Sequence, residues 1–326
     1  MPEFVGSLWV HVERFLSPVI VKTSLLKSTS SRGERLGMQT TLRLMALFGA
    51  LIGLFMLIGW AVGGMFYGDW ITGTIIFAVF AGVINFASYF FSHKIVMWSY
   101  KAKVVTQAEA PRLYNVVNKV CLKANMPMPK IAIVPTQTPN AFATGRNEKT
   151  AVVAATEGLL VMLTDDELEG VLAHEMAHIK DKDMLLMTVA ATIAGAISFA
   201  SRMALWGSMG SRRDNGNALL LLVVAITVPI AAILIRLAIS RSREYKADRE
   251  GALMIQRPLA LARALEKLED ANRRRPFTQG NPASASLFIV NPFRGGGLVT
   301  VFMTHPPIKV RVRRLEQLAD QTGFIG

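Results

Sequence analysis

The chain alternates between long apolar runs and polar segments, and this alternation is its strongest pattern. Residues 44–62 and 71–91 carry no charged side chain, and each run is long enough for a helix to cross about 30 Å of hydrocarbon. Residues 184–200 and 218–235 have the same character, although the first of these two is borderline in length. We therefore predict an α-helical membrane protein with four transmembrane helices, the last of them kinked at Pro229.

Positively charged residues flank the first pair of predicted spans. The segment before them contains Arg32, Arg35 and Arg43, and the segment after them contains Lys94, Lys101 and Lys103. The connecting segment, GGMFYGDW, contains neither lysine nor arginine. Because basic residues gather on the cytoplasmic side of such loops, both flanks are predicted to lie in the cytoplasm.

The connection between the third and fourth runs leaves an alternative open. It carries Arg202, Arg212 and Arg213, which conflicts with a location outside the cytoplasm. A re-entrant hairpin would remove the conflict, whereas the lengths of the two runs favour a full crossing. In either case the soluble segments on both sides of the pair face the same compartment.

The spans divide the chain into five parts. Residues 1–37 form an N-terminal extension whose role the pattern does not reveal, residues 38–93 hold the first two spans, and residues 184–240 hold the second pair. Residues 94–183 and 241–326 are soluble in character. We predict that these two segments together form one cytoplasmic domain.

Local patterns predict an α+β fold for that domain. KIAIVP predicts one strand, and PNAFATG and TAVVAATEGLL predict two more, joined by the polar turn RNEK, which makes a small β-sheet. A helix should begin after Thr164, because Glu167 three residues on completes a capping box. Further helices are predicted in APRLYNVVNKVCLKANM, RSREYKADREGALMIQ, LALARALEKLEDANRRR and HPPIKVRVRRLEQLAD.

Composition supports a membrane location and narrows the class of protein. Hydrophobic residues make up 52% of the chain, the formal net charge is +13 and the sequence pI is about 10.1. Because the sequence contains no motif of a nucleic-acid-binding domain, we assign the basic charge to anionic lipid headgroups beside the spans. Cys121 is the only cysteine, which excludes an intramolecular disulfide and a cysteine-rich zinc site.

Three residues in the helix predicted after Thr164 have the pattern of a metal site. His174, Glu175 and His178 form H-E-x-x-H. Histidines four residues apart lie on one face of a helix and can present imidazole nitrogens to one Zn²⁺. The glutamate beside them can remove a proton from a metal-bound water.

A third ligand is expected elsewhere, because a catalytic zinc usually takes three protein ligands. The segment SREYKAD, after the fourth run, offers Glu244 and Asp248, four residues apart on one helix face. Glu244 would complete the ligand set, and Asp248 would orient a ligand histidine. On spacing alone, the alternative that Glu244 pairs with a nearby lysine or arginine on a solvated face stays open.

The predicted site lies close to the membrane but outside it. His178 is six residues before residue 184, or about 9 Å along a helix, and Glu244 is nine residues after residue 235, or about 13 Å. The charged segments TDDELEG and KDKD flank the histidines, and such charge is costly in hydrocarbon. This argues against an intramembrane protease and predicts a hydrolase that reaches the cytosolic loops and tails of membrane proteins.

Four motifs occur in order along the chain: NAFATG, AHEMAH, SREYKAD and THPP. Together they closely resemble the HtpX family of membrane-integrated zinc metalloproteases, which is related to the CAAX prenyl-protein endopeptidases, and the resemblance covers residues 38–326. It implies a zincin-type (gluzincin) domain with one Zn²⁺ held by His174, His178 and Glu244, and Glu175 as general base. It also implies quality control of misfolded or damaged membrane proteins in the cell membrane, in a stress response and in cooperation with other proteases.

Other residues are assigned supporting roles. The edge of the sheet would bind substrate backbone by strand addition, with a plain hairpin strand as the alternative that the resemblance disfavours; this strand comprises Asn140, Ala141, Phe142, Ala143 and Thr144. His305 in THPP could donate to the oxyanion of the tetrahedral intermediate, and Arg311 could do likewise or hold Asp248. Asp183 is a candidate to hold a metal ligand in place by a hydrogen bond, with a polar boundary before the third apolar run as the alternative. His93 has no partner in the pattern and is predicted to be non-functional.

Two alternative functions stay open beside the zinc endopeptidase. A prenyl-protein processing protease would enclose its site with more than four spans. A non-catalytic zinc-binding scaffold or transporter would have no use for Glu175 beside an open metal position, and the spans lack the polar series of a transport path. The sequence therefore favours peptide-bond hydrolysis.

Overall fold

The computed structural model describes residues 38, 40–64, 68–194, 197, 241–274, 276, 285, 287–291 and 305–324. The predicted extension at residues 1–37 and the predicted fourth span with its kink at Pro229 lie outside the described residues. The elements below belong to the compact unit Arg43–Gly326, except for the first three residues of the first helix.

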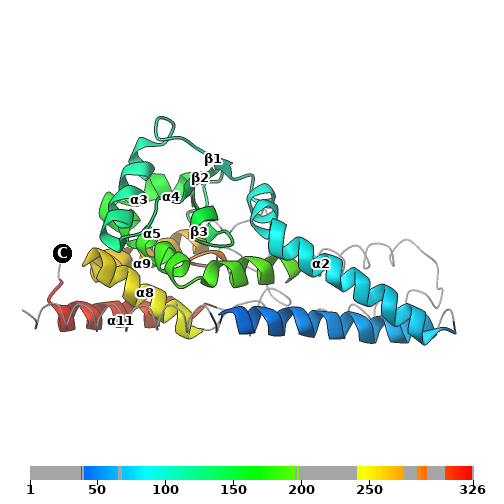
Figure 1. The fold of residues 1–326 in the computed structure, drawn as a ribbon. Coiled ribbons are helices and arrows are strands. Elements are labelled where there is room, and N and C mark those ends of the chain that lie inside the picture. Colours follow the sequence, from blue (N-terminus) through cyan, green and yellow to red (C-terminus); the bar gives the residue numbers. More distant parts are fainter. Residues whose placement is uncertain are drawn as a thin grey trace, which may run out of the picture. The chain divides into compact units, whose positions relative to one another are not determined.

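Two helices in the described part of the chain are long and apolar enough to cross a membrane (Figure 1). They are Thr40–Val62 and α2 (Trp70–Ser99), and they contain the first two predicted spans. The side chain of Asp69 caps α2 by accepting hydrogen bonds from two backbone N–H groups of its first turn. At the third predicted span the structure describes a shorter apolar helix, Asp183–Ala194, so a crossing there and at the fourth span stays a prediction.

The two long helices contact each other closely at glycines. A Cβ atom added to Gly59 would lie 2.4 Å from the carbonyl oxygen of Gly73, and one added to Gly73 would lie 2.3 Å from that of Gly59. Backbones approach this closely only where side chains are absent, which is a common way for helices to pack in lipid. The side-chain amide of Asn85 also donates a hydrogen bond to the carbonyl of Phe48 at 3.2 Å.

After α2 the chain forms a four-stranded sheet of order β1-β2-β4-β3. The strands are β1 (Lys103–Val104), β2 (Lys130–Val134), β3 (Ala141–Thr144) and β4 (Val152–Thr156). β4 pairs in parallel with β2 and antiparallel with β3, and β1 runs antiparallel to β2. Strands occur in all three segments that were predicted to form them, but the prediction for TAVVAATEGLL was too long. Its last residues, from Glu157 on, begin helix α4 (Glu157–Met162), because the hydroxyl of Thr156 accepts a hydrogen bond from the backbone N–H of Leu159 and caps that helix. β3 is an edge strand of this sheet.

The helices of the domain lie in the segments that were predicted to be helical, with the exception of α4. They are α3 (Pro111–Ala124), α4 (Glu157–Met162), α5 (Asp165–Lys180), α8 (Arg241–Ile255), α9 (Pro258–Arg274) and α11 (Ile308–Thr322), with the short 3₁₀ helix η2 (Glu148–Thr150) in the turn between β3 and β4. Helix α5 packs against β3, α3, α8 and α9 (Figure 1). The two separate segments of the chain thus fold around one central helix.

The predicted capping box starts α5. The hydroxyl of Thr164 accepts from the backbone N–H of Glu167 at 3.4 Å, and the Glu167 carboxylate accepts from the N–H of Thr164 at 3.0 Å. Every residue from Glu167 to Ile179 is buried. Helix α8 comes close to this central helix because Gly251 has no side chain: a Cβ atom there would lie 2.8 Å from the backbone nitrogen of His174.

The sheet separates two apolar cores. Val153 and Ala155 of β4 belong to a core with α3, α5, α9 and α11, whereas Val152 and Ala154 belong to a second core with Phe142 and the end of α2. This alternation is what a strand buried on both faces produces. The end of α2 is therefore fixed to the sheet that carries β3.

Candidate metal centre

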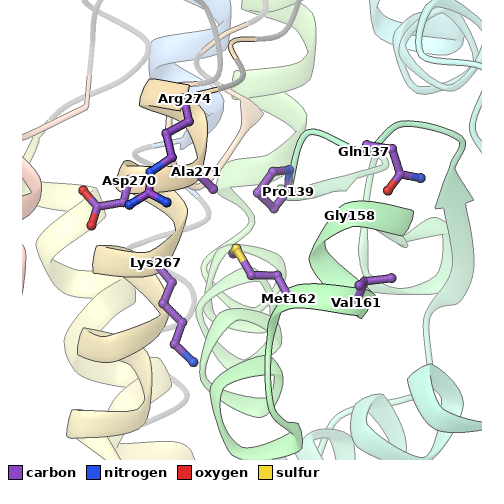
Figure 2. A pocket seen from close by; sticks show the side chains of 9 residues that line it. All are labelled: Gln137, Pro139, Gly158, Val161, Met162, Lys267, Asp270, Ala271 and Arg274. Carbon is purple, nitrogen blue, oxygen red and sulfur yellow. The ribbon is translucent and has the colours of Figure 1, made fainter.

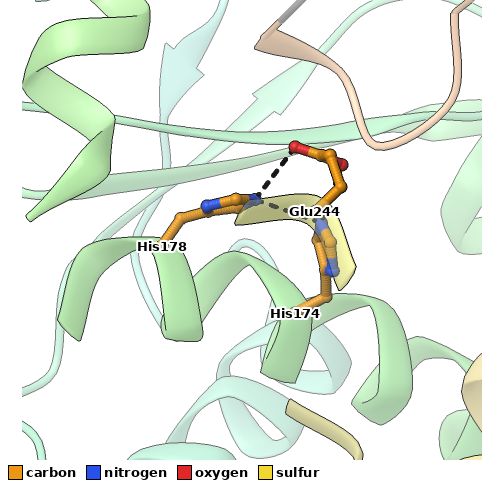
Figure 3. A group of neighbouring side chains, drawn as sticks. All are labelled: His174, His178 and Glu244. Atoms are coloured by element: carbon orange, nitrogen blue, oxygen red, sulfur yellow. Dashed lines mark hydrogen bonds and ion pairs between the residues drawn. The ribbon is translucent and has the colours of Figure 1, made fainter. Parts of the chain in front are cut away.

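Two helices bring three metal-binding side chains together in the interior of the domain. His174 and His178 come from α5, and Glu244 comes from α8 (Figure 3). All three are buried, and one ligand atom of each lies within 4.8 Å of the others. The fold thus gathers the three residues that the sequence suggested as ligands.

The spacing of the ligand atoms fits a small tetrahedral metal site. Nε2 of His178 lies 3.2 Å from Nε2 of His174 and 3.5 Å from Oε1 of Glu244, and Nε2 of His174 lies 3.8 Å from Oε2 of Glu244. Metal bonds of about 2.1 Å at tetrahedral angles separate two ligand atoms by roughly 3.4 Å. Two nitrogens and one carboxylate oxygen are also a donor set that suits a divalent metal.

Burial and mutual contact set the charges of these ligands. Burial, with nearby His174, lowers the pKa of His178 to about 3, so its imidazole is neutral and has a lone pair available. Burial opposes ionisation of Glu244, but contact with His305 and the nearby His178 and Arg311 hold its pKa well below the ordinary value. A neutral imidazole and an ionised carboxylate are the forms that bind a metal.

Behind His174 lies a buried ion pair. Nδ1 of His174 is 2.9 Å from Oδ1 of Asp248, which leaves Nε2 for a metal. Arg311, which has no exposed surface, donates to both carboxylate oxygens of Asp248 at 2.8 and 2.6 Å. Of the two roles considered for this arginine, the geometry favours holding Asp248.

Glu175 is buried close to the ligand group and is not part of it. Burial, and the nearby Glu244 carboxylate, raise its pKa to about 7. Its carboxylate accepts a hydrogen bond from the backbone N–H of Ala143 in β3, which favours the ionised form. A group with this pKa can both accept and release a proton at neutral pH.

His305 contacts a ligand. Its Nδ1 lies 3.1 Å from Oε2 of Glu244, and its Nε2 lies 3.3 Å from the backbone carbonyl oxygen of Ala285. The ring is thus next to the metal centre, as the sequence suggested, and both of its nitrogens have partners in this conformation.

Asp183 lies farther from the ligands. It pairs with Arg243 of α8, whose Nη1 is 2.7 Å from Oδ1 of Asp183, and both side chains are nearly buried. Asp181, two residues earlier, pairs in the same way with Lys246. These pairs join the end of α5 and the helix Asp183–Ala194 to the helix that carries Glu244.

Edge strand β3 is enclosed beside this centre. The backbone N–H of Thr156 donates a hydrogen bond to the carbonyl of Asn140, so the backbone groups of Asn140 face β4. Successive residues of a strand direct their backbone groups to opposite sides, so the N–H and C=O groups of Ala141 and Ala143 point away from β4. The outward N–H of Ala143 is the one that meets Glu175. Residues Ala141 to Thr144 are all buried.

A short apolar segment, residues 287–290, lies along the start of β3, and sequence reasoning assigned it no function. The N–H of Ile289 donates to the carbonyl of Ala141 at 3.3 Å, and the side-chain amide of Asn140 donates to the carbonyl of Val290 at 2.6 Å. Its aromatic residue, Phe288, packs edge-on against Phe142 at 5.4 Å between ring centroids. The apolar run SLFIV in the sequence indicated a buried segment, but it could not reveal that this segment contacts β3, which lies about 150 residues earlier in the chain.

An open cavity lies between α4 and α9, next to the residues that lead into β3 (Figure 2). It has a volume of about 540 Å³ and includes Pro139, one residue before Asn140, together with Val161, Met162 and Lys267. None of the residues of the metal centre lines it. The metal centre is therefore a buried site in this conformation, and the cavity is a separate feature at the end of the edge strand.

Three potential metal ligands with an additional carboxylate beside an edge strand are typical of a metallopeptidase, and the apolar helices indicate one of the membrane. The chain belongs to peptidase family M48, whose sequence profile matches residues 107–319. It is therefore a metalloprotease.

Relatives place the chain more narrowly. It is 49% identical over 296 residues to a "Protease HtpX homolog" of Thermococcus sibiricus, which covers 89% of this chain and 99% of the relative. Another, from Syntrophotalea carbinolica, is 51% identical over 283 residues, covering 85% and 98%. The resemblance to the HtpX family is thereby confirmed. The crystal structure of S. mikatae Ste24p matches with a TM-score of 0.44 at 16% identity, over 86% of this chain and 67% of that one.

Proposed function

We propose that the chain is a membrane-bound zinc endopeptidase that cleaves misfolded or damaged membrane proteins on the cytoplasmic side of the cell membrane. The observation that carries this proposal is Glu175, a buried carboxylate beside the ligands, in contact with Ala143 of the edge strand. A structural or transport site has no use for such a group, whereas hydrolysis needs a base at this place.

His174, His178 and Glu244 would hold the zinc ion, which when bound supplies Lewis-acid activation of water and of the scissile carbonyl. Glu175 would take a proton from the attacking water and give one to the leaving amine, both of which a pKa near 7 permits. Such proton transfer contributes about 10²- to 10⁴-fold to the rate.

The surrounding side chains would hold this arrangement and stabilise charge. Asp248, fixed by Arg311, keeps the ring of His174 turned toward the metal. His305 is close enough to Glu244 to reach the oxyanion that develops on the scissile carbonyl, once its bond to Ala285 is given up. Arg311 would thus position His174 through Asp248, whereas His305 would stabilise the negative charge on the oxyanion during hydrolysis.

Substrate backbone would bind along residues 140–144 by strand addition, using the outward groups of Ala141 and Ala143. The carbonyl of Ala141 is bonded to Ile289 in this conformation, so residues 287–290 would have to move aside for a peptide. The cavity beginning at Pro139 then offers the bound chain a surface beyond the strand.

The location of the site would select membrane proteins as substrates. Helix α5 ends three residues before the apolar helix Asp183–Ala194, so the ligand helix leads almost directly into a membrane-boundary segment. A hydrolase at this depth reaches cytosolic loops and tails of proteins in the same bilayer. Removal of damaged membrane proteins under stress, alongside other membrane proteases, follows as its cellular role.

Cleavage of an unfolded protein by the zinc-loaded, detergent-purified chain tests the proposal. Glu175→Gln should lower the rate at least about hundredfold at equal zinc content, because the base is lost while the ligands remain. Glu316→Gln, on the exposed face of α11, serves as the matched control and should cleave normally. Equal cleavage by both variants would refute the role of Glu175, and zinc binding without any cleavage would favour the scaffold.

A further inference from the structure

A group of cationic side chains lies where α2 meets the turn between β3 and β4. The guanidinium of Arg146, in that turn, lies over the ring of Phe90 in α2 at 5.3 Å. Arg146, Lys94 and Lys130 are the charges that act on His93 of α2. Lys130 begins β2 beside the same turn, since its N–H donates to the carbonyl of Ala151 at 3.0 Å. We refer to His93, Lys94, Lys130 and Arg146 as the basic cluster.

The basic cluster has no anionic partner among the described residues. None of its three permanent cations takes part in an ion pair that the described residues form, although Glu148 lies in the same turn. Nδ1 of His93 and Nε of Arg146 are buried polar atoms that have no hydrogen-bond partner in the described part of the chain. Cations that lie close together repel one another, and a buried donor without an acceptor costs free energy. An anion bound from outside the chain would relieve both costs, so we interpret the basic cluster as a site for such an anion.

The level of the cluster on α2 points to the source of that anion. Residues 71–91 are uncharged, and His93 and Lys94 are the first titratable side chains after them. The rings of Phe90 and Phe91 are exposed, as expected for side chains in contact with lipid, and Lys94 lies 5.7 Å from the centre of the second ring. About 20 residues of helix cross the hydrocarbon, so a span that starts at residue 71 reaches the lipid phosphates near His93.

We propose that the basic cluster binds the phosphate of an anionic phospholipid headgroup. The lipid would bridge the end of α2 and the β3–β4 turn, and would thereby hold the hairpin that contains β3 against the bilayer. Charged guanidinium and ammonium groups around a phosphate make strong, charge-assisted hydrogen bonds. The proposal requires that α2 crosses a membrane, and it does not depend on the proposed peptidase mechanism.

Thermal stabilisation of the full chain by added lipid tests this site. The chain, purified in a zwitterionic detergent, is titrated with phosphatidylglycerol, with phosphatidylcholine or with inorganic phosphate, and Tm is followed. A ligand that binds only the folded chain raises Tm, and above its Kd the rise grows with the logarithm of the ligand concentration. We expect phosphatidylglycerol to stabilise the chain at far lower concentration than phosphatidylcholine, and inorganic phosphate to have no comparable effect.

Variants assign that effect to the cluster. Arg146→Gln should raise about fivefold the phosphatidylglycerol concentration that gives the same rise in Tm, which corresponds to roughly 1 kcal/mol for one basic group at the membrane surface. Lys130→Gln should act in the same direction, and Arg146→Lys should restore most of the affinity. Arg263→Gln removes one exposed arginine from α9 and is the matched control. An equal effect of Arg146→Gln and Arg263→Gln, or equal stabilisation by inorganic phosphate, would overturn the lipid assignment.

Discussion

At the scale of single residues, Glu175 is placed for chemistry at the expense of stability. Its carboxyl has a pKa of about 7 in the folded chain, raised by burial from 4.5, so the folded state prefers the protonated form. When the pKa of a carboxyl group is higher in the folded state than in the unfolded state, the free energy of unfolding falls as pH rises from the unfolded-state pKa through the folded-state pKa. The ionised form of Glu175, which the proposed mechanism needs as its base, is therefore held in a site that disfavours it, and such sites are common for catalytic groups.

This argument predicts a pH-dependent gain in stability when the carboxylate is removed. In the metal-free chain, Glu175→Gln should raise Tm above that of the unmodified chain at pH 8, and the difference should shrink toward zero as pH falls to about 4.5. A gain of several degrees is expected, since a rise of the pKa from 4.5 to about 7 corresponds to roughly 3 kcal/mol. Thermal melts of both chains across this pH range make the comparison, and a difference that does not vary with pH would contradict it.

Most residues of the candidate site could be suggested from the sequence, but the role of Arg311 could not be decided from it. Spacing on one helix was enough to suggest His174 and His178, because residues four apart share a face, and Glu175 was suggested by its place beside them in H-E-x-x-H. The contact of Arg311 with Asp248 joins residues far apart in sequence, and helix periodicity says nothing about such pairs. Two roles for this arginine therefore stayed open until the fold placed it.

At the scale of elements, the relation of β3 to residues 287–290 is the main addition of the structure. The sequence predicted the strand from local alternation, but the segment that lies along it comes from the far part of the chain. Within this segment, the backbone carbonyl of Ile289 accepts a hydrogen bond from Nη1 of Arg311 at 2.7 Å. The same arginine therefore donates hydrogen bonds both to the segment and to Asp248. Moving the segment would remove one bond of the group that orients His174.

Loosening this segment should therefore speed cleavage, provided that the proposed peptidase activity is present. Phe288→Ala removes the ring that packs against Phe142 and against Tyr100 at 5.0 Å, which favours conformations with a free edge strand. We expect a several-fold rise in kcat/KM on an unfolded substrate at unchanged zinc content, together with a lower Tm. Phe86→Ala, an exposed ring on α2, is the control that should leave the rate unchanged. A lower rate with Phe288→Ala would show that the segment supports the substrate strand and does not block it.

At the scale of the whole molecule, the site is assembled from two chain segments that a pair of apolar runs separates. The order of motifs predicted this assembly, because ligands on both sides of the third and fourth runs must face one compartment to meet. The contacts of α5 with α8 agree with it. Lengths of apolar runs indicate spans reliably, but they do not determine depth, so the distance of the site from the bilayer came from counting residues along helices.

A metal centre fixed near the bilayer should favour substrates in the same membrane. One unfolded sequence is offered to the zinc-loaded chain in proteoliposomes, either fused to a transmembrane helix in the same vesicle or free in solution. Tethering confines both partners to one surface and raises their effective concentration, so we expect at least tenfold faster cleavage of the tethered form at low substrate concentration. The gain should appear in the apparent KM and leave kcat unchanged, since the same peptide bond meets the same residues. Detergent should abolish the difference, and equal rates in vesicles would mean that membrane depth plays no part in substrate choice.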